Sequence, residues 1–211
     1  HKACMLNISS DDPDLLNGID SEKISAVRKE RMKANKEFQY YTMSNVGQWS
    51  IVAYPNLKWA KKVFPDLNDE EAYTKLWEAI LYTSRVKANE DVIKAWDDHN
   101  KEIKAHSAKL NEYNFRSLHF KNSLGTDLTV GLIKDHVWEG GADRASGYDC
   151  MFNPNIPTEE VFTMPDRYHI DGTVVSSKPL AYDGKLIEDF RLTFKDGKVV
   201  DFSAKTNEDV L

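Results

Sequence analysis

Two adjacent carboxylates in the second half of the chain have the types and spacing best suited to chemistry. Glu159 and Glu160 follow a proline-stiffened loop at residues 153–157 and open an apolar segment typical of a strand. Carboxylates bind hard and borderline cations. Because successive strand side chains point to opposite faces, only one of the two can face a given ion without distortion. The spacing alone favours a solvated charge pair at a strand end over a metal site.

Other side chains that could bind a metal or act as nucleophiles give weaker signals. His99 and His106 lie on one helical stripe but roughly 10 Å apart along the axis, at about 1.5 Å per residue, so one ion cannot contact both. We expect both to be core or partly buried histidines. Asp127 could be a ligand, although a turn or strand-edge role is favoured. Cys150 lies near His136 in sequence without any nucleophile motif, which favours an inert thiol.

The elements that must position these side chains divide the chain into a helical part and a strand-rich part. Apolar residues at helical spacing predict helices over residues 21–43, 57–63 and 91–110, and a further helix that Asn68 caps in a capping box with Glu71. Apolar and β-branched runs predict strands over residues 3–8, 48–54, 115–120, 126–132, 160–164, 169–176, 186–194 and 198–202. The last two flank Asp196-Gly197, a hairpin dipeptide.

This pattern predicts a mixed α+β fold in two parts. Residues 1–112 are expected to form a partial, helical α/β N-terminal domain, and residues 113–211 a β-rich part of a C-terminal domain, with the boundary near residues 111–114. The first residues already resemble a buried strand with no secretory leader before it, and the last five resemble the first turn of a helix. We therefore expect an internal piece of a longer protein.

Composition narrows the class of protein. The 211 residues include 28 Lys and Arg against 34 Asp and Glu, and the formal net charge of −6 argues against a nucleic-acid partner. No apolar run approaches the roughly 18 residues of a membrane helix, which argues against a membrane partner. Cys4 and Cys150 are far apart and lack metal-binding spacing, which fits a reducing cytosol.

Three stretches, taken in order, carry a family resemblance. They read NSLGTDLTVGL at residues 122–132, NPNIPTEEVFT at residues 153–163, and DGTVVSSKPL at the start of residues 171–204. Shorter stretches upstream, at residues 49–52, 56–60 and 69–73, fit the same pattern. Each stretch is weak alone, but the ordered set runs along nearly the whole chain. It resembles the thermophilic-type metalloaminopeptidases, the family of the aminopeptidase T, aminopeptidase S and PepS type.

The resemblance implies a cytoplasmic, homodimeric exopeptidase that removes N-terminal residues from peptide substrates. It implies a site in the C-terminal domain where two divalent metal ions (zinc, cobalt or manganese) activate a water molecule. The Pro-Thr-Glu-Glu segment would supply the first glutamate ligand, which the motif places at Glu160, with Glu159 as a supporting residue or the alternative ligand. The other ligands and the general base would lie beyond Leu211, so no catalytic residue is assigned and the chain alone is expected to be inactive.

A second hypothesis from another class is a non-catalytic interaction or dimerisation module that keeps the peptidase scaffold. The aromatic load of five tryptophans would suit an interface, whereas core packing explains it better. The tryptophans in question are Trp49, Trp59, Trp77, Trp96 and Trp138.

Overall fold

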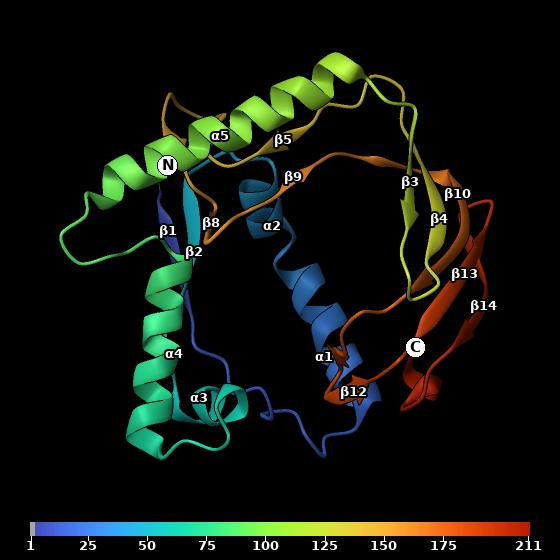
Figure 1. Cartoon of the computed structure of the whole chain (residues 1–211), viewed down its shortest axis with the longest axis horizontal. Coiled ribbons are helices and arrows are strands. Elements are labelled where there is room, and N and C mark those ends of the chain that lie inside the picture. The colour runs from blue at the N-terminus through green and yellow to red at the C-terminus, as the bar shows by residue number, and fades with distance from the viewer. Residues whose placement is uncertain (1–2) are drawn as a thin grey trace. The chain divides into compact units, whose positions relative to one another are not determined.

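The computed structural model describes residues 3–211, with helices concentrated in the first half of the chain and strands in the second (Figure 1). The expected mixed α+β class is confirmed by this order and by the content of both element types. None of the helices within the described range is long and apolar enough to cross a membrane.

The chain divides into two compact units, each built from three segments. The first unit takes the residues up to Leu15, then residues 25–106 and 140–161, and the second takes residues 16–24, 107–139 and 162–211. Residues 140–161, expected in the C-terminal part, belong to the first unit because β8 (Asn155–Ile156) pairs with β2 (Trp49–Ala53). That residues 1–112 and 113–211 act as separate folding domains stays a prediction.

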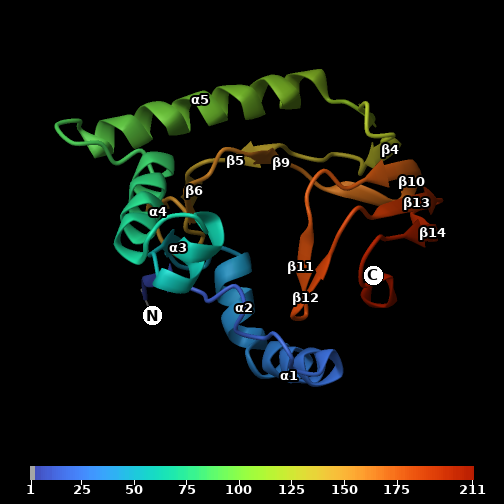
Figure 2. The same cartoon turned by 60° about the horizontal axis from the view of Figure 1, so that its bottom comes forward.

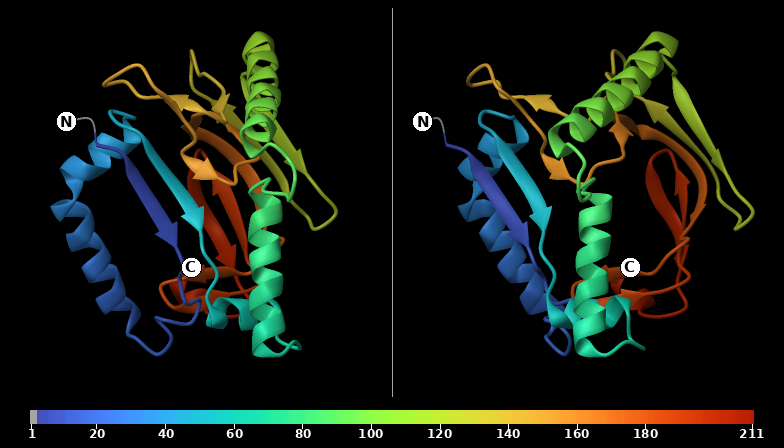
Figure 3. Two further views of the ribbon diagram at one scale, coloured as in Figure 1. Left: turned by 90° about the vertical axis from the view of Figure 1, so that its left-hand side faces the viewer. Right: turned by 60° about the vertical axis from the view of Figure 1, so that its left-hand side comes forward.

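The first unit is organised by a three-stranded parallel sheet in the order β1-β2-β8. Strand β1 (Met5–Ser9) runs beside β2, as Figure 3 shows, and both confirm strands expected from the sequence. Strand β8 was expected to be loop, because prolines lie on both sides of it. It pairs nonetheless: the carbonyl of Pro154 accepts a hydrogen bond from the amide of Ile51 at 2.8 Å, and that bond needs no proline N–H.

Residues 3–211 form five α-helices. The single helix expected over residues 21–43 is two helices, because the chain breaks at Asn35, a residue of low helix propensity with a backbone ψ of 18°. A core of Ala60, Ala72, Leu76 and Ile80 packs the third helix against the fourth. The helices are α1 (Ser21–Ala34), α2 (Lys36–Met43), α3 (Leu57–Val63), α4 (Asp69–Thr83) and α5 (Val92–Tyr113).

Helix α4 begins as the sequence predicts, and its first turn gives a test of stability. The Asn68 side chain accepts a hydrogen bond from the amide of Glu71 at 3.0 Å. Replacing Asn68 with alanine is expected to lower the free energy of unfolding by about 1 kcal/mol. Asn35→Ala is the matched control, because Asn35 precedes α2 without a side-chain capping bond. Urea unfolding of the complete gene product measures both, and equal losses would contradict the capping role.

The second unit is built on a five-stranded antiparallel sheet in the order β14-β13-β10-β4-β3. Figure 2 labels four of these strands, β4, β10, β13 and β14. Asp196 and Gly197 join its last two strands with φ of 48° and 74°, which confirms the expected hairpin turn. The strand expected over residues 186–194 is interrupted at Asp189, whose φ is 48°. The main strands are β3 (Ser117–Lys121), β4 (Asp127–Leu132), β10 (Pro165–Val175), β13 (Arg191–Lys195) and β14 (Lys198–Ser203).

The remaining strands are short. The strand expected over residues 160–164 shrinks to β9, and a hairpin of β11 and β12 precedes the main strands at the end of the chain. These elements are β5 (Glu139–Gly140), β6 (Asp143–Arg144), β7 (Met151–Phe152), β9 (Val161–Phe162), β11 (Leu180–Tyr182), β12 (Lys185–Ile187) and a 3-10 turn, η1 (Glu208–Val210).

Candidate functional site

The two candidate carboxylates lie just beyond the carboxyl end of β8. Because β8 is parallel to β2 and β1, its carboxyl end shares an edge with theirs. At that edge Asn56, after β2, donates to the carbonyls of Ser10 and Asp11, after β1, at 3.0 Å each. The carboxyl ends of parallel strands are the usual place for ligand-binding side chains in α/β sheets. The fold therefore places the Pro-Thr-Glu-Glu segment beside the carboxyl ends of the parallel strands.

Glu159 is held by Arg85, the residue that follows the C-cap of α4. Its Oε1 accepts from Nη1 at 2.6 Å and its Oε2 accepts from Nη2 at 3.0 Å, so the pair is bidentate. Hydrogen bonding from the Arg85 guanidinium lowers the pKa of Glu159 below its ordinary value. Although the Glu159 side chain is 64% exposed, both of its oxygens are thus engaged with a cation.

Buried His99 completes this arrangement. Its Nδ1 lies 3.0 Å from Nη2 of Arg85, and its Nε2 lies 2.7 Å from the carbonyl oxygen of Thr158. A guanidinium only donates, so Nδ1 must accept and Nε2 must carry the hydrogen that Thr158 accepts. Both ring nitrogens are used within the protein, which agrees with the expected core histidine.

The expectation for His106 was wrong, because its side chain is exposed. The buried positions of α5 are His99, Ile103 and Ser107, which repeat at a spacing of four. Ser107 continues this buried face of the helix, so the neighbouring His106 points toward solvent.

Glu160 differs from its neighbour. Its side chain is exposed, and within residues 3–211 its carboxylate makes no hydrogen bond or ion pair. Its backbone is closely packed: a Cβ at Gly140 would lie 2.5 Å from the Glu160 carbonyl oxygen, so only glycine fits there. A free carboxylate on a fixed backbone has the chemistry of a single metal ligand.

A complete metal site needs several ligands close together. Across the described part of the chain, no three His, Cys, Asp or Glu side chains come close enough together to hold an ion. A catalytic zinc site usually has about three protein ligands. Residues 3–211 thus fit one ligand position and do not form a whole site by themselves.

The other residues considered from sequence have structural partners. Asp127, the first residue of β4, binds His119 at 2.7 Å and Lys121 at 3.1 Å. The hydrogen bond from His119 is the main cause of the lowered pKa of Asp127, and this paired strand-edge position is the one expected. Cys150 accepts a hydrogen bond from the amide of Gln48, whose oxygen accepts from Cys4 at 2.8 Å.

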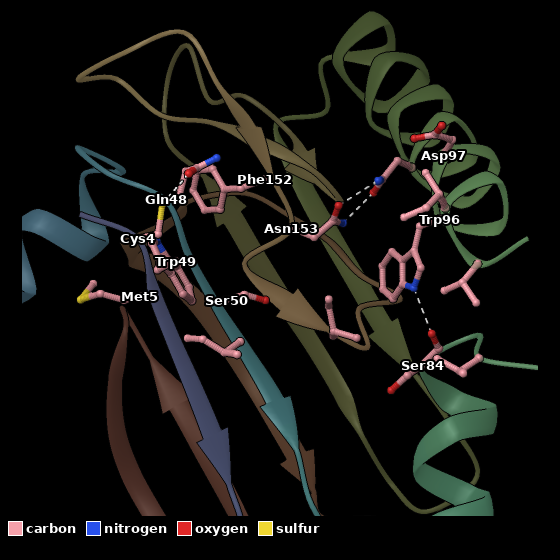
Figure 4. Close-up of a pocket in the computed structure, with 16 residues that line it drawn as sticks. Cys4, Met5, Gln48, Trp49, Ser50, Ser84, Trp96, Asp97, Phe152 and Asn153 are labelled. Carbon is pink, nitrogen blue, oxygen red and sulfur yellow. Dashed lines mark hydrogen bonds between the residues drawn. The ribbon is translucent and has the colours of Figure 1, made fainter. Parts of the chain in front are cut away.

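Near these residues, the first unit contains a cavity of about 620 Å³ that the sequence did not reveal (Figure 4). Its lining is mostly apolar and includes Trp49, Trp96 and Phe152. Two amides, Asn100 and Asn153, exchange hydrogen bonds at 3.0 and 3.1 Å on one side of it, as the dashed lines show. These amides satisfy each other, so the cavity offers mainly an apolar surface.

A second cavity, of about 830 Å³, lies within the second unit. It is lined in part by Asp166 and His169, which are 2.7 Å apart in a segment where the register between β10 and β4 shifts. Gly131 makes room for this segment, because a Cβ there would lie 2.6 Å from the Cβ of His169. The His169 side chain is 75% exposed, whereas that of Asp166 is 27% exposed, so the histidine is the solvated member of the pair.

Arg85 is the residue of the site that sequence reasoning missed. A single arginine after a helix carries no local signal, and its partner Glu159 is 74 residues away along the chain. The only local hint is its position after the C-cap Ser84, where a residue with positive φ is common.

Comparison with known proteins gives consistent matches along the chain. Residues 1–211 match the family described as thermophilic metalloprotease (M29). Aminopeptidase AmpS of Bacillus subtilis (strain 168) is 43% identical over 211 residues, and aminopeptidase PepS of Streptococcus thermophilus is 46% identical over 212. These alignments cover 99% and 100% of this chain and 50% of each relative, so the chain spans about half the length of the curated relatives it matches.

A solved structure agrees with the sequence matches. Wild-type AmpT from Thermus thermophilus superposes with a TM-score of 0.89 at 40% sequence identity. The superposition covers 99% of this chain and 50% of that one. The fold described above is therefore similar to the corresponding half of that structure.

Proposed function

The chain belongs to the thermophilic metalloprotease (M29) family, and on this premise we propose that the complete protein is a metal-dependent aminopeptidase that removes N-terminal residues from peptides. The observation that carries the proposal is the similarity along 99–100% of this chain, at 41–46% identity, to relatives named as aminopeptidases. The carboxyl-edge position of the Pro-Thr-Glu-Glu segment supports it, since the proposed ligand lies where α/β sheets hold their ligands.

The proposal assigns roles to this chain's own residues. Glu160, with a free and exposed carboxylate, holds one of two divalent ions (zinc, cobalt or manganese), while Arg85 keeps Glu159 occupied. When bound, such ions supply the Lewis acidity that polarises a scissile carbonyl and activates water. The other ligands come from outside residues 3–211, because none of the described clusters could hold an ion. The protein would act in the cytoplasm as a homodimer.

An assay of the complete gene product tests the proposal. We expect hydrolysis of aminoacyl p-nitroanilides, loss of turnover after dialysis against a chelator, and recovery when zinc, cobalt or manganese is added back. The control substrate is the same anilide with an acetylated α-amine, which an aminopeptidase should leave intact. Turnover that survives complete metal removal would refute metal dependence, and a lack of any turnover with metal present would favour the non-catalytic module.

A further inference from the structure

The backbone that leads into Glu160 is fixed by buried polar groups. Thr158 is 9% exposed, and its carbonyl oxygen accepts the hydrogen bond from Nε2 of His99, itself 8% exposed. The next residue, Glu159, is clamped through both oxygens by Arg85. Two successive residues before Glu160 are thus tied to the same pair of side chains.

Arg85 is itself held in place from several sides. Its Nη2 donates to His99 as well as to Glu159, and its guanidinium lies 5.6 Å from the ring centroid of Trp96. Trp96 is anchored by a hydrogen bond from its Nε1 to the carbonyl of Ser84 at 2.9 Å. The side chain of Arg85 is only 26% exposed, so the guanidinium is shielded more than a surface cation would be.

The backbone of Arg85 ends helix α4. Its φ of 58° is the left-handed conformation common just after a C-cap, and the amides of Arg85 and Val86 donate to the carbonyls of Tyr82 and Leu81. Arg85 is therefore held by the end of the helix as well as by the contacts of its side chain.

Resting on the proposed function, we propose that Arg85 and His99 are positioning residues that select Glu160 over Glu159 as the metal ligand. Arg85 neutralises one carboxylate of the adjacent pair and holds it on one side of the chain. The carboxylate of Glu160, which precedes β9, makes no hydrogen bond or ion pair with Arg85 or with any other of residues 3–211. Glu160 is therefore left with an unpaired carboxylate on a closely packed backbone, which suits a ligand for a divalent cation.

Removal of the clamp provides the test, made on the complete gene product. In Arg85→Ala we expect zinc affinity, measured by competition with a chromophoric chelator, to fall by about 10- to 100-fold, the usual effect of losing a group that orients a ligand. Arg85→Lys should rescue little of it, because an ammonium cannot bind both carboxylate oxygens and His99 at once. Lys75→Ala is the control, since Lys75 forms an exposed ion pair with Glu78 on α4.

Two further readouts separate positioning from a general loss of stability. Hydrogen exchange should speed up at the amides of residues 158–161 in Arg85→Ala and His99→Ala, and not in the control. Glu159→Gln should weaken zinc binding by a similar factor to Arg85→Ala, and the double variant should be no worse than either single one, because both remove one interaction. Additive losses would contradict the shared role.

The outcomes also separate this inference from the proposed function. If Glu160→Gln abolishes zinc binding while Arg85→Ala binds zinc like the wild type, the positioning role is overturned and the aminopeptidase proposal stands. If zinc binding is absent in the wild type or unchanged in Glu160→Gln, the assigned ligand is wrong, and the positioning role falls with it.

Discussion

Glu160→Gln is expected to reduce kcat/KM of the complete gene product for aminoacyl p-nitroanilides by more than about 100-fold and to lower its bound metal. Glutamine keeps the shape of the side chain but replaces an anionic oxygen with a neutral amide. The loss should exceed the 10- to 100-fold that follows from losing a group that only orients a ligand. Steady-state kinetics and elemental analysis of the dialysed protein measure the two effects.

Glu159→Gln is the matched control, since it changes the same atoms one residue earlier. Its carboxylate is bound by Arg85 and contributes no free charge to an ion, so the expected loss is smaller. A larger loss of activity in Glu159→Gln than in Glu160→Gln would mean that Glu159 leaves Arg85 to bind the metal. The ligand role would then belong to Glu159 and not to Glu160.

Ile187→Ala is expected to cost about 2–5 kcal/mol of unfolding free energy, the usual range for a fully buried aliphatic side chain. Ile187 is 1% exposed and is among the largest fully buried side chains of the described residues. Leu186→Ala, in the same short strand β12, removes a similar side chain that is 49% exposed, and it should cost under about 1 kcal/mol. Thermal and urea unfolding of the complete gene product measure both variants.

Comparable losses from Ile187→Ala and Leu186→Ala would contradict the assigned burial. They would show that both faces of β12 are covered in the complete protein. A large loss confined to Ile187→Ala would confirm that the strand packs through one face.

The sequence was most informative where structure depends on neighbours along the chain. Asn68 caps α4 through the third residue on, and Asp196-Gly197 closes a hairpin between adjacent strands. Both were predicted, because their signals lie within a few residues. The break at Asn35 was missed, since a single asparagine within a helical pattern shifts the balance only slightly.

Strand β8 could not be predicted because its partner is distant. Two residues between prolines have no strand signal of their own and become a strand only when β2 supplies the hydrogen bonds. The same limit applies at the site: the residue types and the family resemblance pointed to Glu159 and Glu160, but the ion pair with Arg85 exists only in three dimensions. The burial of His99 was predicted by helical periodicity, and the same periodicity did not resolve the exposure of His106.

Strand β8 is synthesised long after its partner β2, and this delay has a consequence for biosynthesis. Ile51 finds its partner Asn155 only after roughly 100 further residues have been made, which takes about 5–20 s at ribosomal speeds of about 5–20 residues per second. Until then the outer edge of β2 stays unsatisfied in the nascent polypeptide. We expect the emerging chain to be most prone to aggregation during this interval, and the parallel ladder to close only once the Pro-Thr-Glu-Glu segment has left the ribosomal tunnel.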